Sequence, residues 1–302
     1  MDRFRTVLCP IDFSALTKST LEVASRICQR FGARLVLHHN QGPIPPDFLS
    51  VHWMWSEEHE QHEQRKDIDA AELLQRLFET VPADVDVEAK ITRGPLEKGV
   101  LFLAKTLPAD LVVMGSHGWS TPEHRSVTER VVLEAPCTVL TIRDGCDPEK
   151  LFATRPGKRP HALPVLVVVD RLDGPNAALD FALALAERMP HELDLLHVLK
   201  PTRPDRRAGQ RERRIDDARQ RLESLIPELL TGRARVHVAE GNPGQEILNL
   251  AQTTEPLFML VGARKKTLLR RKRAKQTSLE VLHGAECPAW FVPESSLRPK
   301  PR

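Results

Sequence analysis

The sequence lacks the features that would place the chain in a membrane or outside the cell. No run approaches the ~20 consecutive apolar residues that a helix needs to span a bilayer. The first residues, MDRFRTVLCPID, have neither the apolar core nor the small-residue cleavage site of a signal peptide. The five cysteines are scattered without a C-x-x-C pair, so neither a disulfide framework nor a thiolate metal site is indicated. We therefore expect reduced thiols, no membrane contact and a cytoplasmic location.

The motifs of common catalytic sites are also missing. There is no H-E-x-x-H, no EF-hand loop, no G-x-x-x-x-G-K-[ST] and no nucleophile elbow. His117, beside Ser116, is a candidate acid or base, but a histidine in a loop more often contacts a phosphate or water. His52, His59 and His62 resemble metal ligands, although a polar helix with solvated histidines explains them better. We expect neither an enzyme nor a metal site.

Length and charge divide the chain into two parts. A chain of 302 residues exceeds the size of one hydrophobic core, so two domains are expected. Residues 1–150 carry 17 Lys and Arg against 23 Asp and Glu, and residues 151–302 carry 27 against 18. The acidic and basic parts could attract one another, or the basic part could meet a polyanion.

Five sequence segments recur in the same order. The first pair is TVLCPIDFS at residues 6–14 and PVLVVVDRL at 164–172, each an apolar run that ends in an aspartate. Such order indicates a tandem duplication. The residues that the two copies place opposite one another are Asp12 and Asp170, His38 and His197, Gly94 and Gly241, Gly115 and Gly262, and Cys137 and Cys287.

Within each copy, strands and helices alternate. Continuously apolar runs predict strands that are buried on both faces, in the first copy at 6–11, 34–38, 85–91, 110–114 and 137–142. Helical spacing separates them, and the first helix is expected to begin near a serine cap and to end at Gly32. The alternation predicts an open parallel α/β sheet in each copy. Asp12, Gly94 and Gly115 each follow a strand, so they should converge at the edge where such sheets bind ligands.

The motifs PIDFS, LVLHH, RGP, ADLVVMGSHG and SVTERVVLEAPCTVLTI resemble the universal stress protein family, in a tandem form that covers nearly the whole chain. The resemblance implies two flavodoxin-like α/β domains, each an open, mainly parallel five-stranded sheet with helices on both faces. We place the domains at 1–145 and 162–302, with the Pro-rich and Gly-rich linker 146–161 between them. The family also implies stress-linked regulation, pairing of the two domains, a homodimer and, in some members, bound ATP.

Members that bind ATP have the pattern Gly, two residues, Gly, nine residues, Gly, then Ser or Thr. Here six residues follow Gly118, and Arg125 then stands in place of the glycine. We expect weak or altered ATP binding in the first copy, with a relic loop as the alternative. The resemblance carries this nucleotide role to Asp12, His39, Gly94, Met114, Gly115, His117, Gly118, Arg125, Ser126 and Val127 in the first copy. In the second copy, which departs further, it carries the role to Asp170, Gly241, Gly262, Lys265, Lys275 and Gln276.

A basic cluster replaces the phosphate loop of the second copy. Eight of the twelve residues from Arg264 to Lys275 are Lys or Arg. Such a cluster suits a nucleic acid, another polyanion or an acidic protein surface, while a solvated surface that meets the acidic half is the alternative. The rival to nucleotide binding is therefore a chain whose basic second domain binds a polyanion or an acidic partner.

Overall fold

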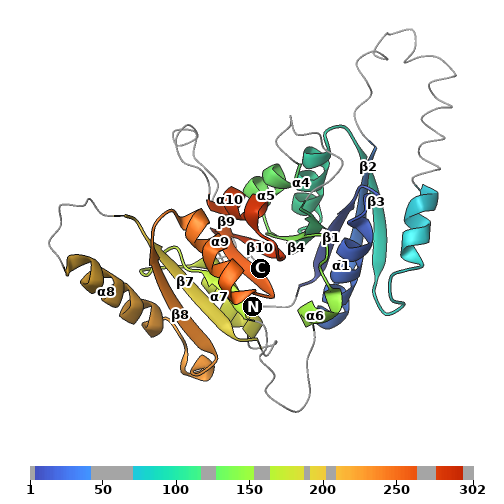
Figure 1. Cartoon of the computed structure of the whole chain (residues 1–302). Helices are drawn as coiled ribbons and strands as arrows, with labels where there is room; N and C mark the ends of the chain where they lie inside the picture. The colour runs from blue at the N-terminus through green and yellow to red at the C-terminus, as the bar shows by residue number, and fades with distance from the viewer. Residues whose placement is uncertain are drawn as a thin grey trace, which may run out of the picture. The chain divides into compact units, whose positions relative to one another are not determined.

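The computed structural model describes residues 4–41, 71–116, 127–152, 164–186, 191–201, 209–263 and 277–294 (Figure 1). The chain forms two compact units, Asp2–Ala135 and Pro136–Arg302, called here the N-terminal and the C-terminal unit. Of the described residues, each sequence copy contributes five strands, β1 to β5 and β6 to β10. The predicted flavodoxin-like α/β fold in two copies is confirmed, whereas the predicted domain boundaries at 145 and 162 stay predictions.

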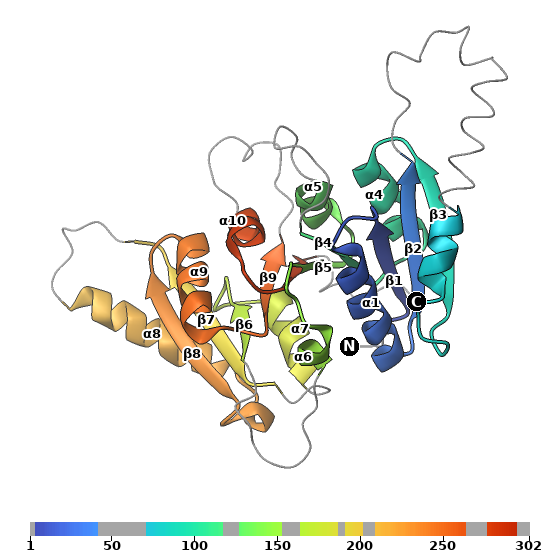
Figure 2. The same ribbon diagram turned by 45° about the vertical axis from the view of Figure 1, so that its right-hand side comes forward.

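The N-terminal unit holds a parallel sheet in the order β3-β2-β1-β4. Its strands are β1 (Thr6–Ile11), β2 (Arg34–Gln41), β3 (Val87–Arg93) and β4 (Leu111–Gly115). Helix α1 (Thr17–Phe31) covers one face, and α4 (Leu96–Thr106) and α5 (Val127–Glu134) cover the other (Figure 2). The strand order reverses between β1 and β4, which is where a doubly wound sheet opens a crevice for ligands.

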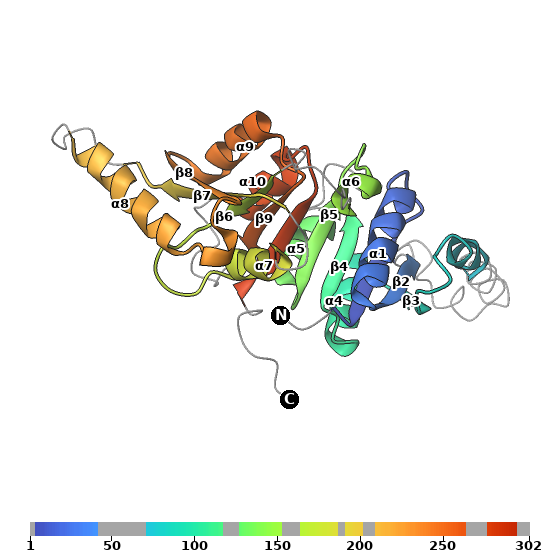
Figure 3. The ribbon, with the colours of Figure 1, turned by 90° about the horizontal axis from the view of Figure 1, so that it is seen from below.

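The C-terminal unit has the strand order β5-β10-β9-β6-β7-β8, parallel except for the antiparallel pair of β5 and β10. Helices α9 and α10 lie on one face and α7 and α8 on the other (Figure 3). The strands are β5 (Thr138–Ile142), β6 (Val165–Val168), β7 (Leu193–Leu199), β8 (Ala234–Glu240), β9 (Phe258–Ala263) and β10 (Ala289–Pro293). The helices are α6 (Pro148–Phe152), α7 (Ala177–Ala186), α8 (Gln210–Ser224), α9 (Pro243–Thr254) and α10 (Thr277–Gly284), with a 3-10 turn at Glu228–Leu230.

Burial explains which runs became central strands. Every residue of β5, β6 and β10 is buried, as are the first four of β4, whereas most residues of β3 and β8 are half-buried. This confirms the predicted burial of the runs 110–114 and 137–142. The prediction that 85–91 is buried on both faces is wrong, because β3 lies at the edge of the sheet. No helix in the described part of the chain is long and apolar enough to cross a bilayer.

The first helix confirms one predicted end and corrects the other. Gly32 follows α1 with a φ of 62°, a left-handed conformation that glycine adopts without strain, and its N–H bonds to the Cys28 carbonyl. The predicted serine cap is wrong, because the cap position is Leu16, which makes no side-chain cap hydrogen bond. Ser14 instead donates its backbone N–H to Asp12, and the hydroxyl of Thr17, the first residue of α1, donates to the same carboxylate.

Candidate functional site

Asp12 directly follows β1 and is held by the turn that leads into α1. Its Oδ1 accepts hydrogen bonds from the Ser14 backbone N–H at 3.0 Å and from the Thr17 hydroxyl at 3.5 Å. Its Oδ2 has no hydrogen-bond partner among the described residues. The intervening Phe13 has a φ of 56°, a left-handed conformation that is costly for a bulky side chain. The turn therefore fixes one carboxylate oxygen and leaves the other for a ligand.

His39, near the end of β2, is fixed next to this turn. Its Nδ1 lies 3.0 Å from the Ile11 carbonyl oxygen, which can only accept, so Nδ1 carries the proton. The Phe13 ring lies against the imidazole, with 4.8 Å between the ring centroids. In a neutral ring, Nε2 is then left as an acceptor.

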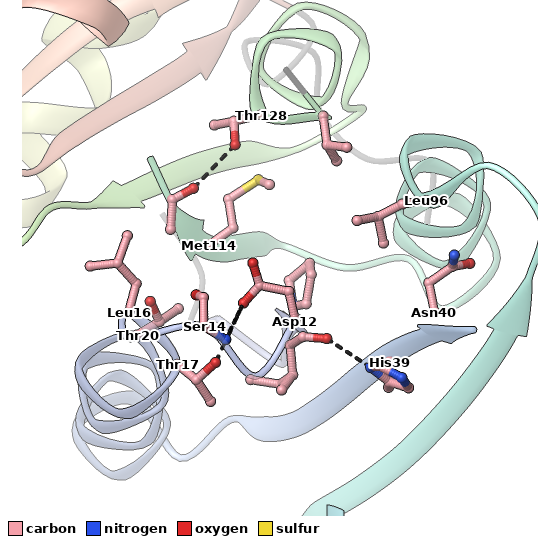
Figure 4. Close-up of a pocket in the computed structure, with 14 residues that line it drawn as sticks. Asp12, Ser14, Leu16, Thr17, Thr20, His39, Asn40, Leu96, Met114 and Thr128 are labelled. Carbon is pink, nitrogen blue, oxygen red and sulfur yellow. Dashed lines mark hydrogen bonds between the residues drawn. The ribbon is translucent and has the colours of Figure 1, made fainter. Parts of the chain in front are cut away.

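These residues border a cavity of about 510 Å³ at the carboxyl ends of β1 and β4 (Figure 4). Its volume lies within the range of small-molecule sites. Apolar side chains of β1, α4, β4 and α5, together with Leu16 just before α1, form much of its wall, and hydroxyl, amide and carboxylate groups are interspersed. The lining residues are Pro10, Ile11, Asp12, Ser14, Leu16, Thr17, Thr20, His39, Asn40, Leu96, Met114, Gly115, Val127 and Thr128.

The structure brings together five of the ten residues predicted for the first copy. They are Asp12, His39, Met114, Gly115 and Val127, all of which line the cavity. Gly94 is not among the lining residues. Its carbonyl accepts a hydrogen bond from the side chain of Asn40, and Asn40 does line the cavity. The remaining four, His117, Gly118, Arg125 and Ser126, lie outside the described residues, so the shortened loop stays a prediction.

Sequence reasoning missed several polar groups at this cavity. The Thr128 hydroxyl donates to the Gly115 carbonyl at 3.1 Å and ties α5 to the end of β4. Thr20 is 2% exposed, lines the cavity, and its hydroxyl has no hydrogen-bond partner in the described part of the chain. A buried hydroxyl without a partner is costly, which makes Thr20 a group that a ligand could satisfy. A threonine one turn after Thr17 on α1 was the available signal.

The second copy has a histidine and an aspartate at the equivalent strand ends, but other side chains surround them. His197 Nδ1 donates to the Val169 carbonyl at 2.7 Å, which repeats the bond of His39. The sequence pairing of His38 with His197 is therefore wrong: strand register pairs Val168 with Leu196 and Pro10 with His38, so the counterpart of His197 is His39.

Asp170, the counterpart of Asp12, is bound by a side chain. Its Oδ1 accepts from the Asn176 amide at 3.1 Å, and Asn176 in turn accepts from the Leu179 backbone N–H. The cavity beside it, about 440 Å³, is lined by five charged side chains besides Asp170: Arg171, Asp173, Arg214, Asp217 and Arg221.

The arginines at this second cavity already have anionic partners. Arg221 pairs with Asp173 and with Asp217, and Arg214 Nη1 lies 3.4 Å from Oε1 of the half-buried Glu240. Gly241 and Gly262 do not line the cavity. The predicted Lys265, Lys275 and Gln276, with the whole cluster from Arg264 to Lys275, lie outside the described residues.

Neither a disulfide nor a cluster of metal-ligating side chains is found in the part of the chain that the structure describes. All five cysteines are free, and burial raises the pKa of Cys28 and of Cys287 to about 12. Within the described ranges, no group of three His, Cys, Asp or Glu side chains could hold a metal ion. His52, His59 and His62 fall outside those ranges.

Comparisons with known proteins agree with the two-copy fold. The model of the Universal stress protein family matches residues 3–143 and 163–293. A universal stress protein of Thermus aquaticus, encoded in the 3′ region of the QAH/OAS sulfhydrylase, is 29% identical over 143 residues, which are 46% of this chain and 99% of that protein.

Two solved structures show the same fold over nearly the whole chain. A universal stress protein of Archaeoglobus fulgidus is 15% identical with a TM-score of 0.65, and the match covers 95% of this chain and 96% of that one. A protein of Pseudomonas aeruginosa described as a putative universal stress protein is 15% identical with a TM-score of 0.60, covering 97% and 94%. With both copies matched by the family model, the chain belongs to the universal stress protein family.

Proposed function

We propose that the first copy binds an adenine nucleotide, with ATP as the leading candidate, and that the chain acts as a ligand-responsive module of the stress response. The observation that carries this proposal is the cavity at the end of β1, where Asp12 presents a carboxylate oxygen without a described partner. Membership of the family, some of whose members bind ATP, supports it.

The lining residues suit the three parts of a nucleotide. A carboxylate accepts hydrogen bonds from ribose hydroxyls, so Asp12 would hold the sugar. Backbone groups at Gly115 and the N-terminus of α5 would favour the phosphates, because a helix N-terminus attracts anions. Apolar Ile11 and Leu96 border the remaining part of the cavity, which leaves them to contact the base.

Binding without chemistry is the second part of the proposal. Two titratable side chains, Asp12 and His39, line the cavity in the described part of the chain. Each already has one polar atom bound to the backbone, Asp12 Oδ1 to Ser14 and His39 Nδ1 to Ile11. Among the described residues, the hydroxyl that bonds to either of them is that of Thr17, which lies 3.5 Å from Asp12 Oδ1. A nucleophile and its base are expected about 2.6–3.2 Å apart, so this long contact supports a binding role over catalysis.

One nucleotide per chain is expected, because the second cavity offers a different environment. Asn176 binds Asp170 there, and the arginines at its border pair with Asp173, Asp217 and Glu240. Polyanion or acidic-partner binding through Arg264 to Lys275, the homodimer, the pairing of the two copies and the cytoplasmic location stay predictions.

Isothermal titration with Mg-ATP at low salt tests the proposal with two matched variants. Asp12→Asn keeps an acceptor for Ser14 but replaces the ionised oxygen, so affinity should fall about tenfold or more, the size of a lost charged hydrogen bond. Asp170→Asn makes the same change in the second copy and should leave affinity unchanged.

Saturable binding of about one ATP per chain is the expected result for the unmodified protein. Absence of binding up to millimolar ATP would overturn the proposal. Equal losses in the two variants would overturn its assignment to the first copy.

A further inference from the structure

A chain of three hydrogen bonds, called here the relay, lies next to the cavity of the first copy. His38 Nε2 lies 2.7 Å from the Thr92 hydroxyl, which donates to Asn40 Oδ1 at 2.9 Å. Asn40 Nδ2 then donates to the Gly94 carbonyl at 2.9 Å. The chain joins β2, β3 and the turn before α4, and Asn40 is the member that lines the cavity (Figure 4).

The bonding pattern fixes the orientation of every group in this chain. The Gly94 carbonyl can only accept, so the amide nitrogen of Asn40 faces it and the amide oxygen faces Thr92. The Thr92 hydroxyl therefore donates to Asn40 and accepts from His38, whose proton must be on Nε2. Gly94 has a φ of 100°, a conformation that glycine adopts without strain. In this conformation its carbonyl accepts the hydrogen bond from the Asn40 amide.

His38 is suited to act as a fixed, neutral donor. Its side chain is 0% exposed, and burial, followed by the influence of neighbouring His39, lowers its pKa to about 4. Its Nδ1 has no partner among the described residues, so protonation would leave a buried N–H unsatisfied. At neutral pH the proton therefore stays on Nε2.

The second copy, which has the same strands, lacks this chain of bonds. Strand register places Leu196 where the first copy has His38, and Val198 faces Ala239 as Asn40 faces Thr92. The first copy thus has polar residues at these positions, next to a cavity lined largely by apolar side chains. The second copy has apolar residues there, next to a cavity lined by charged side chains. Fold alone does not require them, which points to a role in the ligand site.

We propose that Asn40, positioned by Thr92 and His38, is the residue that selects the base of the ligand and favours adenine over guanine. This inference rests on the proposed nucleotide binding. A primary amide has two hydrogens and two acceptor positions, and its bonds with described residues use one of each. One donor and one acceptor remain.

The remaining donor and acceptor match one base and not the other. Adenine presents N6–H and N7 side by side, a donor and an acceptor that an asparagine amide pairs with in both directions. Guanine presents O6 and N7, two acceptors, so one of them would face the amide oxygen. The Thr92 hydroxyl, held by His38, keeps the amide oxygen in one place, where the group at position 6 of the base is a donor in adenine and an acceptor in guanine.

The test is a comparison of ATP and GTP affinities in the full chain. Wild type should prefer ATP by about tenfold or more, the discrimination of a two-bond amide contact. Thr92→Val keeps the shape but removes the hydroxyl, so the preference should shrink to within about threefold. Thr92→Ser restores the hydroxyl and should restore the preference.

Thr141→Val is the matched control, because Thr141 is a buried threonine of β5 whose hydroxyl bonds to the Ala289 carbonyl in the C-terminal unit. It should leave both affinities unchanged. If Thr92→Val does not fold, Asn40→Val, which introduces the residue of the second copy, is expected to abolish the preference in its place.

The outcomes separate this inference from the function on which it rests. Saturable ATP binding without a preference over GTP, or a preference that survives both Thr92→Val and Asn40→Val, overturns the role of Asn40 and leaves nucleotide binding intact. Failure of wild type to bind either nucleotide overturns both. Nitrogen NMR of the imidazole adds a readout without ligand: the His38 proton should reside on Nε2, and a proton on Nδ1 would contradict the relay.

Discussion

Gly99 of α4 packs directly against Thr92 of β3, so closely that a Cβ atom at position 99 would stand 2.5 Å from the Thr92 hydroxyl oxygen. The same Cβ would lie 3.4 Å from Asn40 Oδ1 and from His38 Cε1. Gly99 therefore faces all three side chains of the relay. The absence of a side chain lets α4 lie close to the sheet without displacing them.

Gly99→Ala should destabilise the N-terminal unit despite the better helix propensity of alanine. The methyl group must push the Thr92 hydroxyl away, and overpacking of this kind destabilises a protein by about 1–3 kcal/mol. The higher helix propensity of alanine offsets about 1 kcal/mol of this loss. Urea unfolding should therefore show a lower midpoint, and the ATP preference should weaken. Gly262→Ala is the control, since a Cβ at Gly262 would meet nothing within 4 Å. Unchanged or higher stability of Gly99→Ala would contradict the expected overlap.

The sequence predicted the strands and the strand-end residues because their signals are local. A run of apolar residues that ends in Asp or Gly marks the end of a buried strand, and this placed Asp12 and Gly115 at the cavity. The relay has no such signal. Asn40 and Thr92 are 52 residues apart, and they meet because β2 and β3 pair in one particular register. Register depends on the whole sheet, so it could not be read from either segment.

The predicted pairing of His38 with His197 is wrong for a similar reason. His38 and His197 were paired because each is preceded by a Leu-rich run. In the structure, His39 and His197 are equivalent, since each donates to the carbonyl of the residue before the strand-end aspartate. Asp194, a carboxylate in the apolar run LDLL, was missed altogether because its partners lie on the next strand.

Asp194 is 0% exposed and is neutralised by two side chains of β8. Its Oδ1 accepts from Arg235 Nε at 2.9 Å and from His237 Nε2 at 3.1 Å. Burial alone would raise the pKa of Asp194, but the hydrogen bonds from His237 and Arg235 outweigh it and lower the pKa. The carboxylate is therefore ionised at neutral pH and depends on both partners.

Arg235→Gln should lower the stability of the C-terminal unit by about 2–3 kcal/mol at pH 7, because it leaves a buried charge with one charged partner fewer. Arg221→Gln is the control, since Arg221 pairs with Asp173, whose side chain is 82% exposed, and ion pairs between exposed side chains contribute little to stability. Denaturant unfolding of both variants checks the difference. Equal losses would show that the Asp194 cluster is no more important than a surface ion pair.

Acid should destabilise the N-terminal unit through His38, over a window that the pKa values define. The folded pKa of about 4 lies below the ordinary value near 6.5, so the unfolded chain binds more protons between these two pH values. Stability therefore rises with pH across the window and is lost as pH falls from about 6.5 to about 4. The loss is about 1 kcal/mol per pH unit in the middle of the window.

His38→Leu introduces the residue that the second copy has at this position, and it removes the titrating group. Between pH 6 and pH 4.5, the free energy of unfolding of the variant, measured in urea, should fall with acid by about 1 kcal/mol per pH unit less than that of wild type. His283→Leu, which replaces an exposed histidine of α10, should keep the wild-type sensitivity. If His38→Leu lost stability with acid as steeply as wild type, His38 would not be buried as a neutral donor, and the relay that orients Asn40 would lose its first member.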